Sequence, residues 1–279
     1  MLYSFILYDM DTKNKRAIIL LGHAQSGKTT LSESLLYFCK ATTRRGTVAD
    51  GTTVSDYSFD EIERKSSINA SLLYCDYKGM RLEIIDTPGY ADFFGEAISG
   101  TRAVDSAIIV VDATAGVEVG AERAWQILEE AQLPCIIFVN KLDKEGADLN
   151  KVLSDIQNAF SKRAVKLDSL DCPEVAEAVA ESDDKLLQKY LEGAKFTPDE
   201  LSNGLRQAVI KRKVFPVVMG SASTDKGIAE ILDIIIKYMP SPFERTKVEA
   251  ANPAKPEERK DLQLKDEAPL SAFVFKSIS

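Results

Sequence analysis

The sequence predicts an α/β fold in which a mostly parallel β-sheet carries helices on both faces. Short apolar runs typical of buried strands alternate along the chain with segments of helical periodicity, which favours a parallel sheet. A glycine-rich loop follows the first apolar run, and short polar signatures follow the later ones. Because such sheets bind ligands at the carboxyl ends of their strands, we expect these signatures to form one site.

Composition sets bounds on the function. The 279 residues are 45% hydrophobic, which allows a substantial core. The net charge of −8 argues against a general or sequence-specific nucleic-acid binder, so any contact with RNA must be local. No apolar run approaches the roughly 20 residues of a membrane span. We therefore expect no membrane contact. We also expect a cytoplasmic protein, a monomer, in which the cysteines Cys39, Cys75, Cys135 and Cys172 are free thiols.

The first apolar run, residues 17–21, leads into a loop that fits G-x-x-x-x-G-K-[ST], the phosphate-binding pattern of nucleoside triphosphatases. Helical spacing of apolar residues follows the loop. Gly22 and Gly27 allow a tight turn that brings backbone N–H groups close to phosphate oxygens. Lys28 should reach the β- and γ-phosphates, and the Thr29 hydroxyl should ligate Mg²⁺. The expected nucleotide-binding residues of this loop are Gly22, His23, Ala24, Gln25, Ser26, Gly27, Lys28, Thr29 and Thr30.

Residues 40–70 are polar and show little apolar periodicity. A loop of this length inside a compact domain is usually functional or disordered. Its place after a phosphate loop predicts a nucleotide switch, ordered by the γ-phosphate and Mg²⁺. The alternative is a mobile insertion without a role.

The next segment predicts a β-hairpin with Lys78-Gly79 as its turn, between strands at residues 71–77 and 81–85. The second strand runs into Asp86-Thr87-Pro88-Gly89. We expect the Asp86 carboxylate near the metal ion and the Gly89 N–H on the γ-phosphate.

Two further apolar strands, residues 106–112 and 135–139, flank a helix at 120–131. The second strand delivers Asn140-Lys141-Leu142-Asp143, an N-K-x-D signature of guanine recognition. The Asp143 carboxylate can accept hydrogen bonds from the guanine N1–H and 2-amino group, which adenine lacks. A last strand at 214–219 ends in four residues expected to meet the guanine O6, namely Gly220, Ser221, Ala222 and Ser223.

Residues 146–212 interrupt the alternation with charged, helical patterns and no obvious buried strand. Thr197-Pro198-Asp199-Glu200 predicts a helix start. A closing helix follows at 225–239. Residues 243–266 have the composition of a linker, and 268–276 resemble a new strand. Since a lone strand is no domain, we expect the N-terminal part of a longer protein.

Together, GHAQSGKTT, DTPGYADF, NKLDKEGAD and GSAS resemble the GTPase domain of elongation factor G and its relatives among the ribosomal translation GTPases, over residues 14–242. The resemblance implies a P-loop GTPase domain that uses GTP/GDP and Mg²⁺ and has the ribosome as its partner. Ser67 stands where the family has an Mg²⁺-ligating threonine. The implied metal site is Thr29 and Ser67, with Asp86 in the outer coordination sphere.

The implied domain organisation has five parts: an extension at 1–13, a GTPase domain at 14–145 and 213–242, a helical insertion at 146–212, a linker at 243–266, and the first strand of a second, β-barrel domain at 267–279. In the family the insertion meets ribosomal stalk proteins. The alternative here is a solvated helical decoration.

The sequence departs from the family at three places. Tyr90 replaces the histidine that positions the attacking water, Gln25 replaces an aspartate, and Lys65-Ser66 replaces Gly-Ile. A tyrosine hydroxyl is a poor base at neutral pH, so hydrolysis by the expected catalytic residues Tyr90, Lys28 and Gly89 should be slow or altered.

Three functions remain open on the sequence. The first is a GTP-hydrolysing translation factor that acts through its switch loops. The second is a GTP-dependent ribosome-binding regulator with little hydrolysis. The third is a ribosome-protection or recycling factor.

Overall fold

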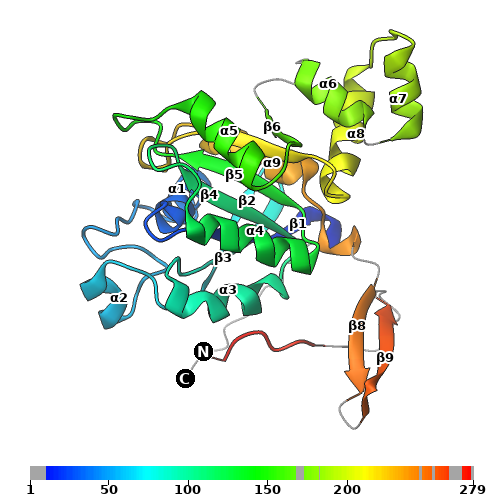
Figure 1. The fold of residues 1–279 in the computed structure, drawn as a ribbon. Helices are drawn as coiled ribbons and strands as arrows, with labels where there is room; N and C mark the ends of the chain where they lie inside the picture. The colour runs from blue at the N-terminus through cyan, green and yellow to red at the C-terminus, as the bar shows by residue number, and fades with distance from the viewer. Residues whose placement is uncertain are drawn as a thin grey trace.

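The computed structural model describes residues 11–167, 173–181, 183–244, 247–252, 255–263 and 272–277. A seven-stranded sheet occupies the centre of the molecule, with strand order β2-β3-β1-β4-β5-β7-β6 (Figure 1). All its pairings are parallel except the antiparallel pair β2–β3. The strands are β1 Lys15–Gly22, β2 Ser71–Tyr77, β3 Met80–Asp86, β4 Ser106–Asp112, β5 Cys135–Asn140, β6 Ala164–Lys166 and β7 Phe215–Met219.

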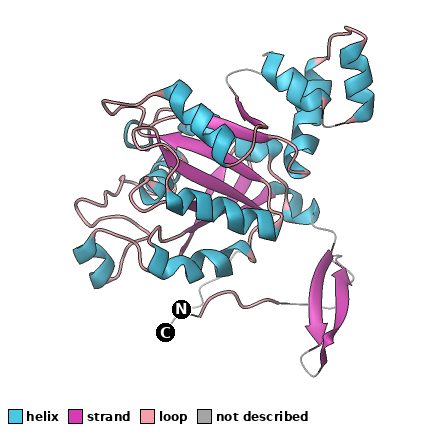
Figure 2. Cartoon of the chain, in the orientation of Figure 1, coloured by secondary structure: helices cyan, strands magenta, loops and turns pink. Residues whose placement is uncertain are grey.

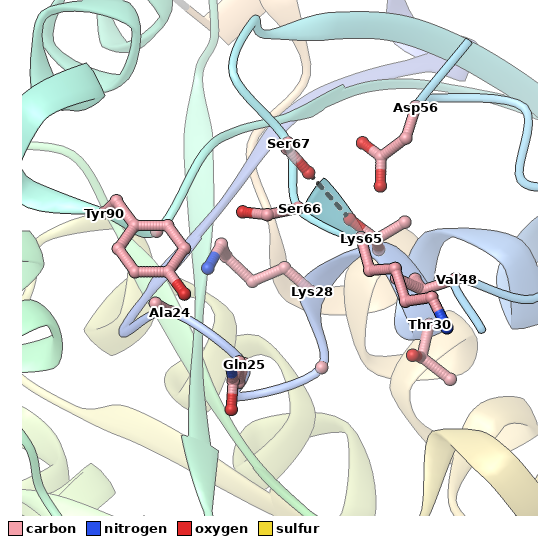
Figure 3. A pocket seen from close by; sticks show the side chains of 13 residues that line it. Ala24, Gln25, Lys28, Thr30, Val48, Asp56, Lys65, Ser66, Ser67 and Tyr90 are labelled. Atoms are coloured by element: carbon pink, nitrogen blue, oxygen red, sulfur yellow. Dashed lines mark hydrogen bonds between the residues drawn. The ribbon is translucent and has the colours of Figure 1, made fainter. Parts of the chain in front are cut away.

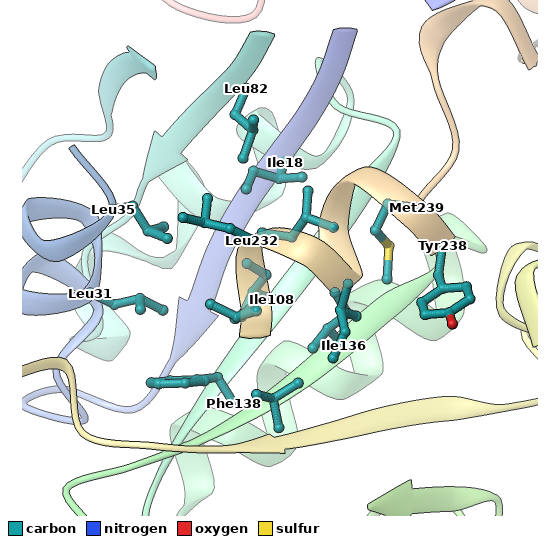
Figure 4. Close-up of a cluster of buried hydrophobic side chains, with 14 of the residues drawn as sticks. Ile18, Leu31, Leu35, Leu82, Ile108, Ile136, Phe138, Leu232, Tyr238 and Met239 are labelled. Carbon is teal, nitrogen blue, oxygen red and sulfur yellow. The ribbon is translucent and has the colours of Figure 1, made fainter. Parts of the chain in front are cut away.

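Helices cover both faces of this sheet, as the alternation predicts (Figure 2). Successive residues of β1 point to opposite faces: Ile18 belongs to one buried cluster and Ile19 to the other. The first cluster includes residues of helices α1 (Lys28–Phe38) and α9 (Ile228–Tyr238) (Figure 4). The second includes α4 and α5. The helices around the sheet are α1 Lys28–Phe38, α3 Phe94–Thr101, α4 Val119–Ala131, α5 Leu149–Ala159 and α9 Ile228–Tyr238, with 3₁₀ turns at Thr12–Asn14, Ala91–Phe93, Ala222–Thr224 and Pro242–Glu244.

The parallel register aligns the carboxyl ends of the central strands. Leu20 lies opposite Asp86, and Asp112 lies opposite Asn140. The phosphate loop, the Asp86 turn and the Asn140 turn therefore leave the sheet at one edge.

The predicted hairpin is confirmed. β2 and β3 pair from Ser71↔Asp86 to Tyr77↔Met80, leaving Lys78 and Gly79 as the two-residue turn. Both turn residues have positive φ, 49° and 80°, which matches a type I′ turn.

Residues 40–70, the switch segment, are mostly irregular but contain the short helix α2 Phe59–Arg64, which the sequence analysis missed. Ser58 and Glu61 form a reciprocal capping box at its start. The S-x-x-E spacing is the signal that predicts this helix, although no apolar periodicity accompanies it.

The prediction that residues 146–212 contain no buried strand is wrong. The short strand β6 pairs with β7 at the edge of the main sheet, and Ala164 is fully buried. Three residues are too few for a period-2 pattern to stand out. Helix α5 packs on the main core through Val152 and Ile156. The other helices of this region are α6 Pro173–Ala180, α7 Asp184–Leu191 and α8 Pro198–Ile210. Buried residues of α6 and α8 join the first core cluster, and the predicted cap at Thr197 is confirmed.

The linker prediction for residues 243–266 is also wrong, because β8 Lys247–Asn252 and β9 Lys255–Gln263 form an antiparallel hairpin. Its polar strands lack the alternation that identifies a half-buried strand. Of the predicted strand at 268–276, residues 272–276 are described and have no strand. They pack back on the main domain, where Lys276 pairs with Glu96 and Phe275 meets the core.

Some of the sequence predictions concern residues outside the described part of the chain, namely 1–10, Cys172 and 267–271. Of the other cysteines, Cys39, Cys75 and Cys135 are free thiols, as expected. None of the helices in the described ranges is both long and apolar enough to cross a bilayer.

Candidate functional site

A cavity of about 220 Å³ lies at the carboxyl edge of the sheet (Figure 3). Three segments far apart in the sequence line it: the phosphate loop and start of α1, the switch segment, and the turn after β3. The structure thus brings together the phosphate-loop, switch and D-T-P-G predictions.

The site needs glycine at three positions because neighbouring atoms lie too close to the backbone there to leave room for a Cβ. Gly27 has φ 98°, and a Cβ there would collide with the Asn140 side-chain amide. A Cβ on Gly22, at φ 142°, would collide with the Val110 carbonyl. At Gly89 a Cβ would lie 2.6 Å from the Ala24 backbone nitrogen and still closer to the Lys28 ammonium. The absence of side chains at these glycines therefore lets the loops pack closely and leaves the cavity open for phosphate groups.

Lys28 is buried, and its ammonium donates to the carbonyls of Gly22 at 3.1 Å and His23 at 2.8 Å. Burial lowers the pKa of Lys28 to about 8, although Asp86 and Asp56 oppose that shift. These bonds hold a cation beside Gly89, at the end of the cavity where Tyr90 lies (Figure 3).

The predicted Mg²⁺ ligands also converge. Thr29 Oγ1 lies 3.2 Å from Ser67 Oγ, so the switch segment closes onto α1 at this point. Asp86 accepts from Ser32 Oγ at 3.1 Å through Oδ2, and its buried Oδ1 has no partner among the described residues. Burial raises the pKa of Asp86, and Lys28 opposes that rise. Two hydroxyls beside an unsatisfied carboxylate oxygen suit a hard divalent cation such as Mg²⁺.

Asp56 is a site residue that the sequence analysis missed. It lines the cavity, and burial raises its pKa to about 6, with Asp86, Glu61 and Glu33 adding to the rise. Its Oδ1 lacks a partner among the described residues. No local pattern marks this residue, because its burial depends on how the switch segment folds over α1.

The residues predicted to recognise guanine lie together, next to the phosphate loop. Asn140 joins two of the loops: its amide donates to Ser26 O at 3.0 Å, and its Oδ1 accepts from Ala222 N at 2.8 Å. The Asp143 carboxylate accepts from Ser221 Oγ at 2.6 Å and Ser223 Oγ at 3.3 Å.

The hydroxyl of Ser221 lowers the pKa of Asp143, which keeps this carboxylate an acceptor at neutral pH. Lys141 is braced by Asp112, with 2.5 Å between Nζ and Oδ2. Gly220 begins the loop, and a Cβ there would crowd the ring of Phe138 at 2.9 Å. N-K-x-D and G-S-A-S therefore build one polar surface around Asp143.

His23 differs from the other predicted residues in the direction of its side chain, whereas Tyr90 lies in the cavity. The side chain of His23 is turned toward α4, where Nδ1 accepts from Gly120 N at 3.2 Å and Nε2 lies 3.4 Å from Glu118. His23 thus contributes its backbone to the phosphate loop. Tyr90 lines the cavity and is 43% exposed.

Two buried glutamates hold the switch segment, and neither was singled out from the sequence. Glu33 on α1 accepts from the backbone nitrogens of Gly46 at 2.9 Å and Val54 at 2.5 Å. Glu61 accepts from Ile68 at 2.9 Å and Asn69 at 3.0 Å. These bonds place Ser67 next to Thr29.

Comparison with known proteins agrees with this geometry. A family model, the elongation factor Tu GTP binding domain, matches residues 13–241. Among solved structures, the protein ttk003000868 from Thermus thermophilus is similar, with 32% sequence identity and a TM-score of 0.78. That match covers 84% of this chain and 41% of the Thermus chain, so the present chain spans less than half of that protein.

The matched range contains the phosphate loop, the D-T-P-G turn, the N-K-x-D turn and the G-S-A-S loop. Together with the parallel sheet that carries them, the match shows that this chain belongs to the elongation factor Tu GTP-binding domain family.

Proposed function

We propose that this chain is the GTP-binding and GTP-hydrolysing part of a cytoplasmic translation factor of the elongation factor G type. It acts on the ribosome through its nucleotide-dependent switch segment. The observation that carries the proposal is the convergence of Lys28, Gly89 and Ser67 on one cavity, with Asp143 on the neighbouring base-recognition surface.

In this proposal, different residues bind the guanine base, the phosphates and the metal ion. The Asp143 carboxylate accepts from the guanine N1–H and 2-amino group, and Asn140 ties this surface to the phosphate loop. The ammonium of Lys28 neutralises charge on the outer phosphates, and the Gly89 N–H donates to the terminal one. Mg²⁺, held by Thr29 and Ser67 with Asp86 behind them, would supply further charge neutralisation at the phosphates.

Hydrolysis needs a water molecule aimed at the terminal phosphorus, and Tyr90 is the side chain at that end of the cavity (Figure 3). Its hydroxyl can orient water by a hydrogen bond but is a weak base, since its reference pKa is near 10. His23, the sole histidine of the sequence, faces α4 and does not substitute. We therefore expect slow turnover that depends on the ribosome.

The test is single-turnover GTP hydrolysis by the full-length protein, with and without ribosomes, beside a Tyr90→His variant. Strong stimulation by ribosomes supports a working GTPase. We expect the histidine to raise the stimulated rate by about 100-fold, the lower end of what a positioned general base contributes. An unchanged stimulated rate in Tyr90→His would contradict the proposed weakness of Tyr90.

The second candidate is a GTP-dependent ribosome-binding regulator with little hydrolysis, and Tyr90 is the observation that favours it. GTP-dependent ribosome binding without stimulated hydrolysis would support it. Displacement of labelled GDP by ATP as readily as by GTP would contradict both candidates, because Asp143 should reject adenine.

A further inference from the structure

Lys65 is a second lysine of the phosphate cavity, and the proposed function leaves it unused. It lines the same cavity as Lys28, Thr30 and Tyr90. It is exposed, and within the described ranges its ammonium forms no ion pair. A cation therefore stands free at the mouth of a cavity suited to a polyanion.

Lys65 has a backbone conformation that favours glycine. It ends α2 in the left-handed region, with φ 52° and ψ 44°, and its N–H bonds to the carbonyls of Glu61 and Ile62. Glycine adopts this conformation without cost, whereas a residue with a Cβ is strained there. A strained lysine that points into a ligand cavity suggests a use for its side chain.

Lys65 and Lys28 serve opposite ends of the cavity. Lys28 extends toward Gly89 and Tyr90, whereas Lys65 extends toward Thr30 and Val48 (Figure 3). The Thr30 end is the nucleoside side, because Ser34 Oγ bonds both Thr30 O at 3.0 Å and Ala222 O, in the base-recognition loop, at 2.5 Å.

From these observations we propose that Lys65 is a second phosphate-binding cation, which pairs with the phosphate chain at its nucleoside end. The proposal rests on the proposed function, since it needs a guanine nucleotide in this cavity. Asp56 places a carboxylate in the same cavity, Asp86 is buried close enough to interact with it, and the protein as a whole carries a net charge of −8. A second cation offsets their repulsion of the nucleotide.

The position of the ammonium sets the specificity of its effect. The inner phosphates are common to GDP and GTP, so Lys65 should hold both nucleotides. It then ties the end of α2 to the nucleotide even without a γ-phosphate. Thr29 and Ser67, by contrast, respond to the metal ion and the terminal phosphate.

The test is titration of the full chain with fluorescent GDP and a non-hydrolysable GTP analogue. Lys65→Gly should raise both dissociation constants by about three- to ten-fold, and the salt dependence of binding should weaken. Lys65→Arg should retain most of the affinity, and Lys65→Gln should not. Glycine suits φ 52°, so the melting temperature of Lys65→Gly should not fall below that of the wild type.

Lys40→Gly is the matched control, because Lys40 is exposed and has φ 59° but lies outside the phosphate cavity. Equal affinities in Lys65→Gly and Lys40→Gly would overturn the inference, as would an effect on the GTP analogue alone. A wild type that binds neither nucleotide would overturn the proposed function together with it. Binding by the wild type with no change in Lys65→Gly would overturn the inference alone.

Discussion

The phosphate loop and the switch segment face each other across one cavity but are held in different ways. The phosphate loop is held by close backbone packing, in which Gly22 and Gly27 leave no room for a side chain. The switch segment is held by carboxylates, with Glu33 and Glu61 accepting from backbone nitrogens at 2.5–3.0 Å. The first arrangement makes a rigid cradle, and the second can be released by loss of a few hydrogen bonds.

The largest effect, on nucleotide affinity, should come from a substitution in the phosphate loop. Gly27→Ala should weaken binding of fluorescent GDP by more than about 100-fold, because its Cβ collides with the Asn140 amide and distorts both the phosphate and base loops. Gly79→Ala is the matched control, since Gly79 also has positive φ, 80°, but meets nothing within 4 Å. Comparable affinities in the two variants would show that close packing does not define the cradle.

An intermediate effect should come from Glu33. Glu33→Ala leaves the Gly46 and Val54 nitrogens without their acceptor, and we expect a loss of about 3 kcal/mol in the free energy of unfolding. Urea denaturation measures this loss, and limited trypsin digestion should show faster cleavage near Arg44 and Arg45.

The exposed Glu63 on α2 provides the control, because Glu63→Ala should change neither measurement appreciably. A switch segment as resistant to trypsin in Glu33→Ala as in the wild type would remove the proposed difference between the two regions.

The smallest effect should come from Glu61 in the switch segment, whose contribution to stability should depend on pH. Burial alone would raise the pKa of Glu61, but hydrogen bonds from Asn69, Ile68 and Ser58 outweigh burial and lower it. Since the folded-state pKa lies below the unfolded value, the stabilisation by Glu61 is present above pH 4.5 and is lost as the pH falls below that value.

Glu61→Gln should therefore cost about 1 kcal/mol at pH 7 and nearly nothing in strong acid. The measurement is urea denaturation of both proteins at several pH values between about 3 and 7. A difference that stays constant across that range would mean that the ionised carboxylate is not what holds the end of the switch segment.

Sequence reasoning makes its most specific predictions where a pattern is contiguous in the chain. The loop from Gly22 to Thr29 requires its spacing for phosphate binding, and the Asn140–Asp143 turn requires its spacing for a base, so each pattern predicts its own chemistry. Reasoning failed for β6 and for the hairpin β8–β9, whose strands are too short or too polar to show a period-2 pattern.

The sequence by itself determined the α/β alternation and the spacing of the phosphate loop and the N-K-x-D turn, because each depends on neighbours in the chain. Only the tertiary structure decided how the switch segment is held. Glu33 bonds residues 13 and 21 positions away, and the cavity joins Lys65 to a loop some 40 residues earlier. Contacts over such separations follow from how the switch segment folds over α1, and no local spacing encodes them.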